Sequence, residues 1–406
     1  MFRKRLRNKR SIVALAATGL VILLAAATDA PSAPTEGAGP RVVSTPYVVL
    51  GFNDLGMHCM NEDCSELLIL PPYNNIHAQV VDRTHGSPEI VTQGISVEYV
   101  IPSNTRSSDK TNFWVHAQAL LGASIPPDVG VTGSRLSGTM SRTVGGNDYS
   151  IIGVPITPID DAGREDPYPL ATITAKRNGV VMGTTQVVVP VSWEIGCNIC
   201  HNTPGISTAT DILRKHDTMH GTQLEASKPV LCAGCHADPA LGTPGQPGVS
   251  AFSSAMHLSH GPRMEQAGLA NECYACHPGV RTLCQRDVHL ARGMQCNDCH
   301  ISMEAVGDPN RTPWVDEPKC GGCHQADHPT WEFEEPGKNY KESRGHRNIM
   351  CASCHGSPHA ITPTITAADN VQAITAQGHP GRIDTCSVCH SETPDDPFPH
   401  RRSDDD

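Results

Sequence analysis

Large aromatic side chains are scarce in this 406-residue chain, in which Phe, Tyr and Trp together account for 4% of the residues. A segment with so few large apolar groups cannot order itself by side-chain burial alone. The shortage matters most in the second half, where Gly, Pro, His and Cys crowd together and hydrophobic periodicity disappears. An ordinary hydrophobic core is therefore excluded there, and something other than side chains has to supply one.

Positive charge is also in short supply. The chain has 31 Lys and Arg residues against 42 Asp and Glu, a formal net charge of −11 at pH 7. Nucleic acid is a poor partner for such a chain, because its phosphates require a basic face. An acidic protein instead suits cationic partners, such as basic redox proteins or metal ions.

Beyond residue 30, no stretch is apolar enough to cross a membrane. The first ten residues carry six positive charges, residues 11–27 are apolar, and Ala25 to Ala27 offer an A-x-A cleavage site. This pattern predicts a signal peptide over residues 1–30, and hence export. The apolar run of 17 residues also leaves a retained N-terminal anchor open. No cysteine follows the run, so a lipoprotein anchor is not indicated.

Residues 31–40, rich in Pro, Gly and Ala, predict a linker. Residues 41–195 are predicted to form an all-β, sandwich-like domain, because β-branched runs alternate with Gly, Pro, Asn and Asp. The Asn178-Gly179 pair between two such runs predicts a two-residue hairpin turn with positive φ at both positions. One helix is expected, at residues 112–121. The predicted strands are residues 42–50, 76–81, 95–101, 150–156, 170–176 and 180–191.

Cysteine is abundant, and 14 of the 17 cysteines fall in seven copies of Cys-x-x-Cys-His. Each copy is the attachment motif for a c-type haem, in which two thiols form thioether bonds and the histidine reaches the iron. Zinc ribbons are the alternative, but they do not need a histidine after every cysteine pair. The attachment cysteines are Cys197, Cys200, Cys232, Cys235, Cys273, Cys276, Cys296, Cys299, Cys320, Cys323, Cys351, Cys354, Cys386 and Cys389. The proximal histidines are His201, His236, His277, His300, His324, His355 and His390.

Seven haem c groups would supply the core that residues 196–400 otherwise lack. This domain is expected to carry little regular secondary structure beyond short helices, and to be largely unfolded without haem, because the bound groups provide the folding energy. The motifs begin 23 to 41 residues apart with no fixed period, which excludes a solenoid. Short gaps place successive haems close together, so that electrons can pass between irons. Residues 401–406 are predicted to be a charged tail.

Each haem iron has a second axial position, and ten further histidines in this half could fill the seven positions. Bis-histidine ligation gives a saturated iron that carries electrons, whereas a methionine ligand would raise the potential. The favoured distal candidates are His220, His257, His260, His289, His346, His359 and His379, and the weaker ones are His216, His328 and His400. Met219, Met256, Met294 and Met350 stay open as alternatives at one or two sites.

Three cysteines lie outside the motifs. Cys59 and Cys64 predict a short-loop disulfide in an oxidising compartment. A soft-metal site that adds His58, Met57 or Met60 to these thiols is the alternative. Cys284 has no evident partner and could be a free thiol, an intermolecular bridge or a sulfur ligand to iron.

Residues 196–400, about half of the chain, resemble the multihaem c-type cytochromes with which metal-reducing and other anaerobic bacteria move electrons across and beyond the cell envelope. Besides the seven motifs, the segments 216–220, 256–260 and 351–359 look like distal-ligand segments of that group. Residues 53–59 look like part of a leader domain that precedes haem runs in relatives. The resemblance implies a heptahaem cytochrome c domain behind the β domain.

The sequence thus predicts an electron carrier rather than an enzyme, exported to the periplasm or the cell surface. Its partners would be redox proteins or an extracellular acceptor, and the β domain would dock it to another protein or to the outer membrane. One alternative is a multihaem reductase of a nitrogen or sulfur oxyanion, which keeps one iron open. Another is a conducting filament, a homo-oligomer in which a histidine such as His400 is lent to a neighbour's iron.

Overall fold

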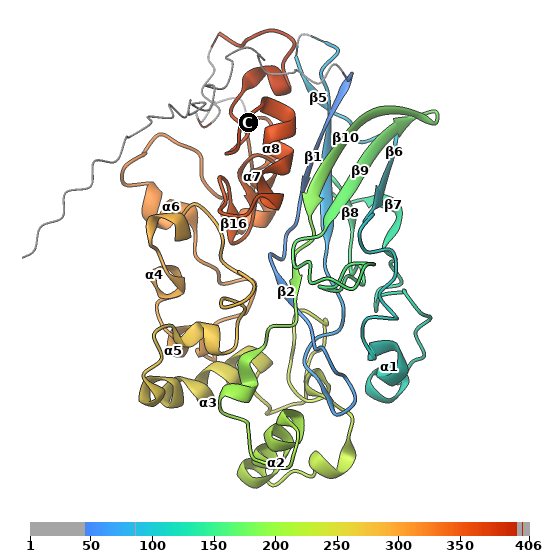
Figure 1. Cartoon of the computed structure of the whole chain (residues 1–406). Helices are drawn as coiled ribbons and strands as arrows, with labels where there is room; N and C mark the ends of the chain where they lie inside the picture. The colour runs from blue at the N-terminus through green and yellow to red at the C-terminus, as the bar shows by residue number, and fades with distance from the viewer. Residues whose placement is uncertain (1–44, 86, 396–399, 401–406) are drawn as a thin grey trace, which may run out of the picture. The chain divides into compact units, whose positions relative to one another are not determined.

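The computed structural model describes residues 45–85, 87–395 and 400 (Figure 1). The predicted signal peptide and charged tail lie outside these residues, as does the predicted linker. No helix among the described residues is long and apolar enough to span a membrane. The described residues form one compact unit, and the predicted boundary near residue 195 stays a prediction.

One antiparallel sheet dominates the first half, with the strand order β1-β4-β8-β7-β6-β9-β10 and with β5 paired to β4. Its inward side chains form the largest hydrophobic cluster of the described residues, which includes Val97, Ile156 and Ile173. The strands are β1 (Tyr47–Phe52), β4 (Ile76–Asp82), β5 (Glu89–Ile90), β6 (Ser96–Val100), β7 (Ser137–Arg142), β8 (Tyr149–Ile151), β9 (Leu170–Arg177) and β10 (Val180–Val188).

The sheet curls until its two ends approach each other. A Cβ atom on Gly51 of β1 would lie 2.9 Å from Cδ1 of Ile173, and one on Gly183 of β10 would lie 2.5 Å from the carbonyl oxygen of Tyr47. Glycine at these two positions permits the close approach of the strands. The predicted all-β character is confirmed, but the strands form a single, nearly barrel-like sheet where two stacked sheets were expected.

Each of the six predicted runs overlaps a strand of this sheet, and the predicted helix is α1 (Phe113–Leu121). The predicted hairpin is confirmed as well. Asn178 and Gly179 have φ of 50° and 81°, and Val180 pairs with Arg177. Strand β7 was not predicted, because only one of its residues, Met140, is buried, which leaves no alternation to reveal it.

The second half packs directly on the sheet. Figure 1 shows α7 (Cys351–His355) and α8 (Val371–Gln377) beside β1 and β10. Gln372 of α8 donates from Nε2 to the carbonyl oxygen of Gly51 (3.0 Å) and accepts from its N–H (2.7 Å). The amide of Gln372 thereby covers backbone groups of β1 that the sheet leaves unpaired.

A second buried amide, that of Gln79 on β4, holds the segment around α7. Its Oε1 accepts from the N–H of Met350 (2.8 Å) and from Oγ of Ser353 (2.9 Å), and its Nε2 donates to the carbonyl oxygen of Asn348 (3.1 Å). These contacts explain a fully buried polar side chain in the sheet, since such a group is costly without partners. The sheet therefore serves as a scaffold for the second half.

Four short strand pairs complete the strands of the described residues, and one of them, β3 with β12, connects the two halves. Parallel pairs join β2 (His58–Cys59) to β11 (Val191–Ser192) and β3 (Leu67–Leu68) to β12 (Val230–Leu231), while β13 (Arg344–Gly345) pairs with β14 (Ile349–Met350) and β15 (Gly356–Ser357) with β16 (Ala360–Ile361). The remaining helices are short, apart from α2 and α3. They are α2 (Thr208–His220), α3 (Phe252–Ala267), α4 (Cys296–His300), α5 (Met303–Gly307) and α6 (Cys320–His324).

Candidate functional site

Each of the seven Cys-x-x-Cys-His motifs lies on a single helical turn. In the motif that begins at Cys273, for example, the N–H of His277 donates to the carbonyl oxygen of Cys273 at 2.8 Å. Residues three and four apart on a helix share one face, so both thiols and the imidazole of a motif lie on the same side of the turn. The turns are η1 (Gly196–Ile199), η3 (Cys232–Gly234), η4 (Glu272–Ala275), α4, α6, α7 and η8 (Cys386–Val388).

Every motif histidine faces a second histidine from elsewhere in the chain. The separations of the ring centres fall between 5.5 and 6.4 Å. The pairs are His201–His260 (6.4 Å), His236–His216 (6.4 Å), His277–His257 (6.2 Å), His300–His359 (6.1 Å), His324–His289 (6.2 Å), His355–His400 (5.5 Å) and His390–His346 (6.0 Å).

These separations fit two imidazoles on opposite sides of one metal ion. A metal–imidazole bond of about 2 Å, with about 1.1 Å from the nitrogen to its ring centre, puts the two centres roughly 6.2 Å apart. Six of the seven pairs lie between 6.0 and 6.4 Å. A direct hydrogen bond between the rings would bring them closer. The residues present therefore fit seven irons with two axial histidines each.

In several of these rings, Nδ1 already contacts a hydrogen-bonding partner. Nδ1 of His257 contacts the carbonyl oxygen of Ser253 (2.8 Å), and Nδ1 of His260 contacts that of Met256 (2.8 Å). When Nδ1 is tied in this way, Nε2 is the nitrogen left for a metal, and the contact fixes the ring orientation. The same holds for His216 with Oγ1 of Thr222 (2.9 Å), His236 with the carbonyl oxygen of Ser250 (2.8 Å) and His289 with Oδ2 of Asp287 (3.1 Å).

Helix α3 positions two of the facing histidines. His257 and His260 are three residues apart and share one face of the helix, as the spacing predicts. They nevertheless face two different motif histidines, His277 and His201. One helix therefore supplies a ring to each of two sites.

Two other facing histidines sit at turn positions with positive φ. His359, at 59°, occupies the two-residue turn between β15 and β16, and His346, at 41°, lies between β13 and β14. Such a conformation is uncommon for a residue with a side chain and clusters at functional sites. The two small hairpins thus aim one ring each at His300 and His390.

The C-terminal histidine is held by a stack of rings. His328 stacks on Trp331 with ring centres 3.6 Å apart, and Trp331 in turn stacks on His400 at 5.6 Å. The N–H of Glu332 also donates to the carbonyl oxygen of His400 at 2.9 Å. His328 thereby supports the His355–His400 pair without facing a motif histidine itself.

Burial keeps several of these imidazoles neutral. It lowers the pKa of His277, His355 and His359 to about 4. The neutral ring is the form that binds a metal ion. These three rings are therefore ready to bind metal at neutral pH without losing a proton.

The placement of the histidines agrees only in part with the order of preference from the sequence. Five favoured candidates face a motif histidine, namely His257, His260, His289, His346 and His359. The structure does not place His220 or His379 in this way. His220 is exposed at the end of α2 beside His216 (4.7 Å), and Nε2 of His379 lies 3.8 Å from Oδ1 of Asp384. The weaker candidates His216 and His400 take these two positions.

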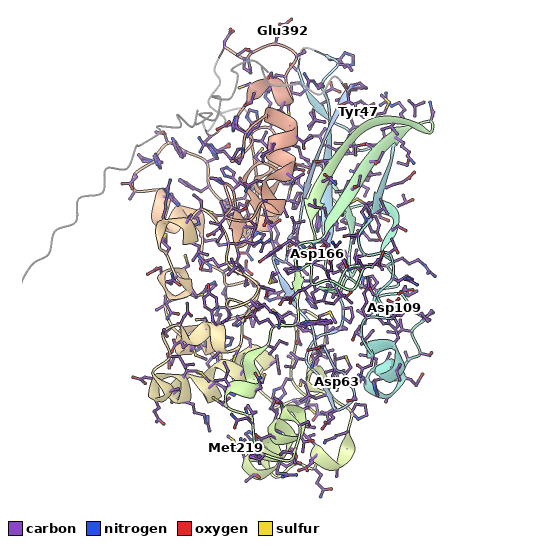
Figure 2. The ribbon with its side chains drawn as sticks, in the orientation of Figure 1. Tyr47, Asp63, Asp109, Asp166, Met219 and Glu392 are labelled. Atoms are coloured by element: carbon purple, nitrogen blue, oxygen red, sulfur yellow. The ribbon has the colours of Figure 1, made fainter. Side chains whose placement is uncertain are left out.

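Two of the methionine alternatives are placed away from the facing rings. Met350 is buried against Phe52 and Ala352. Met219 lies near the end of α2, where its side chain is 55% exposed (Figure 2).

The cysteines outside the motifs are free thiols, so the predicted disulfide between Cys59 and Cys64 is not formed. Cys64 is buried in the cluster around Phe113 of α1, whereas Cys59 belongs to the short strand β2, which pairs with β11. Packing thus takes the two thiols into different surroundings. Sγ of Cys284 lies 4.0 Å from Nδ1 of His359.

Among the described residues, no group of three or more His, Cys, Asp or Glu side chains could hold a metal ion by itself. A zinc ribbon needs four such ligands. The soft-metal alternative at Cys59 is likewise not assembled, and Nε2 of its neighbour His58 contacts the carbonyl oxygen of Pro71 at 2.7 Å. A facing histidine pair would supply two ligands to an iron, and a porphyrin would supply the other four.

Among the histidines of the first half, His77 lies between two carboxylates. Its Nδ1 is 2.8 Å from Oδ2 of Asp148 and its Nε2 is 3.4 Å from Oδ2 of Asp54. Burial opposes protonation, but the hydrogen bond to Asp148 and the nearby carboxylate of Asp54 outweigh it and raise the pKa of His77 to about 9. The ring stacks on Phe52 at 5.1 Å. His77 is thus a buried cation that joins β4 to the residue before β8 and to the segment after β1.

We expect this cation to make stability depend on pH. Because the pKa of His77 is raised from 6.5 to about 9, its contribution is fully present below about pH 6.5 and is lost as the pH rises through 9. The contribution is roughly 3 kcal/mol. Urea unfolding of the wild type and of His77→Gln should therefore differ at pH 6 and converge near pH 10. An unchanged difference across this range would contradict the assignment, and His85→Gln, at an exposed position, serves as the control.

Comparison with known proteins finds no family model, no curated protein and no solved structure that matches this chain significantly.

Proposed function

We propose that residues 196–400 bind seven c-type haems and that the protein carries electrons along them. The observation that carries this proposal is the set of seven facing histidine pairs, one for each Cys-x-x-Cys-His motif, at separations that suit a shared iron. When bound, haem supplies reversible one-electron chemistry at its iron.

The chain's own residues would have three tasks at each site. The two motif cysteines hold the porphyrin through thioether bonds, and the motif histidine binds the iron from one face. A distal histidine closes the other face, in the order His260, His216, His257, His359, His289, His400 and His346 along the seven motifs. Contacts at Nδ1 hold several of these rings in position.

Two histidines at each motif would fill both axial positions of an iron, which favours a carrier over a reductase. An enzyme that reduces a nitrogen or sulfur oxyanion needs an iron with an open position, and each motif histidine here has a facing ring. In the filament alternative, His400 would bind an iron of a neighbouring chain. In this structure the ring centre of His400 instead lies 5.5 Å from that of His355 in the same chain. We therefore propose a saturated electron carrier.

The location and partners of such a carrier follow from the sequence. The basic and apolar N-terminal segment supports export, and attachment of c-type haem fits the periplasm or cell surface. The formal charge of −11 supports basic redox proteins or cationic metal complexes as partners. The curled sheet, which holds the second half through Gln79 and Gln372, is proposed as the docking module.

Spin-state spectroscopy of the oxidised, purified protein tests the proposal. Magnetic circular dichroism in the near infrared should show seven low-spin irons with two histidine ligands each and no high-spin iron. The reduced protein should not bind carbon monoxide rapidly. One high-spin iron together with rapid carbon monoxide binding would instead support the reductase.

A further inference from the structure

We propose that the seven sites form one unbranched row in which the first two are exchanged relative to the sequence. Named by their first cysteines, the sites follow the spatial order Cys232, Cys197, Cys273, Cys296, Cys320, Cys351 and Cys386. The Cys232 and Cys386 sites are then the two ends at which redox partners exchange electrons. This inference rests on the proposed function, since the order matters only if each site binds haem.

Helix α3 joins the Cys197 site to the Cys273 site. Its His260 faces His201 of the first, and its His257, one turn earlier, faces His277 of the second. The two motifs also meet through their backbones. A Cβ atom on Gly196 would lie 2.4 Å from the carbonyl oxygen of Ala275. Sites 76 residues apart in the sequence are therefore direct neighbours in space.

Helix α2 joins the Cys197 site to the Cys232 site. Near its start, Asp211 accepts a hydrogen bond from Oγ1 of Thr203 (3.0 Å) and lies 3.9 Å from Nδ1 of His201. Further along the same helix, His216 faces His236. The Cys197 site thus has both other sites as neighbours. The start of α3 also reaches the Cys232 site, where Phe252 lies 6.0 Å from His236, and the proposed row runs from the Cys232 site through the Cys197 site to the Cys273 site.

The following sites continue the row in sequence order. Sγ of Cys273 lies 3.7 Å from Oδ1 of Asn297, and Nδ2 of Asn271 donates to Oε1 of Gln295 (3.2 Å), so the Cys273 and Cys296 motifs touch. His289, seven residues before Cys296, faces His324 of the Cys320 site. The loop before Cys296 therefore serves the next site in the row.

The last three sites are linked by the segment 339–350 and by the turn before η8. Asn339 accepts from Nζ of Lys319, next to Cys320, while Tyr340 donates to the carbonyl oxygen of Gly356, next to His355 (2.6 Å). The N–H of Ile383 then donates to the carbonyl oxygen of Cys354 (2.9 Å), which brings the chain to the Cys386 motif. These contacts place the Cys320, Cys351 and Cys386 sites in succession.

The figures show how the helices beside these sites are arranged. In Figure 1, α2, α3, α4, α6 and α7 follow one another along one side of the unit formed by residues 40–406. In Figure 2, Met219 on α2 marks one end of this unit, and Glu392, two residues after His390, marks the other. The Cys232 and Cys386 sites therefore lie at opposite ends.

Transfer along such a row is balanced without covalent chemistry. For each electron accepted from a reduced one-electron donor at one end, one electron passes to an oxidised acceptor at the other. No bond forms or breaks, and no proton is required. The Cys197 site is the obligatory link between the Cys232 site and the other five.

Flash photolysis of the haem-loaded, full-length protein tests the order. A photoreducible ruthenium complex is attached through Met219→Cys, an exposed position on α2. In the parent, one injected electron should spread over several sites. When the Cys197 site is removed by Cys197→Ala and Cys200→Ala, the electron should stay at one site and the later redistribution phases should be lost.

The matched control removes the site at the far end, by Cys386→Ala and Cys389→Ala, and should keep the early redistribution phases. If the Cys197 variant redistributes electrons as this control does, the Cys232 site has a direct route to the Cys273 site and the proposed order is wrong. Failure of the proposed function is a separate result, since the parent would then carry fewer than seven haems by mass.

A second measurement covers the case in which the Cys197 variant does not fold. His216→Ala opens the iron of the Cys232 site to a high-spin state, whose magnetism broadens the resonances of neighbouring low-spin sites. In the proposed row the Cys232 site has one neighbour, so His216→Ala should broaden the resonances of one other site. His257→Ala opens the Cys273 site, which has two neighbours, and should broaden the resonances of two other sites. Two broadened sites for His216→Ala would overturn the order.

Discussion

Replacing His216 with alanine should convert one of the seven irons from low spin to high spin and let it bind carbon monoxide. His216 faces His236 at 6.4 Å, and its Nδ1 is held by Oγ1 of Thr222. Loss of this ring opens the axial position opposite His236. The spectroscopic change should amount to one seventh of the total haem signal, measured by magnetic circular dichroism and by carbon monoxide difference spectra.

The control lies four residues away on the same helix. His220 is exposed beside His216, and His220→Ala should leave all seven irons low spin. In the double variant His216→Ala/His220→Ala, His220 cannot take the place of His216 as the axial ligand. If His220→Ala alone produced the high-spin iron, the facing pairs would not identify the ligands.

Preventing haem attachment should unfold most of residues 196–400 while the β-sheet persists. The sheet has an extensive core of its own, but the cluster centred on Met264, Ala275 and Met303 of the second half has only these three buried members. A segment with so little buried apolar surface cannot offset its conformational entropy without a bound group. We therefore expect folding of this half to be coupled to haem binding.

Limited proteolysis of a variant with all 14 motif cysteines replaced by serine tests this expectation. A fragment covering the sheet, about residues 45–192, should resist digestion, while the remainder should be degraded rapidly. The haem-loaded wild type should be resistant throughout under the same conditions. Equal resistance of the second half in both proteins would show that side chains alone hold it.

The elements with local signals could be predicted from the sequence. The Asn178-Gly179 turn, the amphipathic strand β9 and the motif turns each follow from neighbouring residues. The curling of the sheet could not be predicted in this way. It depends on Gly51 meeting Ile173 and on Gly183 meeting Tyr47, which are contacts between distant segments.

The same distinction applies to the histidines. His257 and His260 stand three apart on a helix, so their shared face was visible in the sequence. The choice between His216 and His220 depends on where α2 points, and the sequence favoured His220, whereas His216 is the ring that faces His236. His400 is brought opposite His355 by its stack on Trp331, a contact across 69 residues of sequence that no local pattern reveals.

The mass of the intact, mature protein, measured under denaturing conditions, tests the central claim most directly. Thioether bonds survive denaturation, so haem attached at the seven motifs remains on the chain. We predict an increase over the polypeptide mass equal to seven haem groups. An increase of fewer than seven groups would contradict the claim that each motif, with its facing histidine, holds one haem.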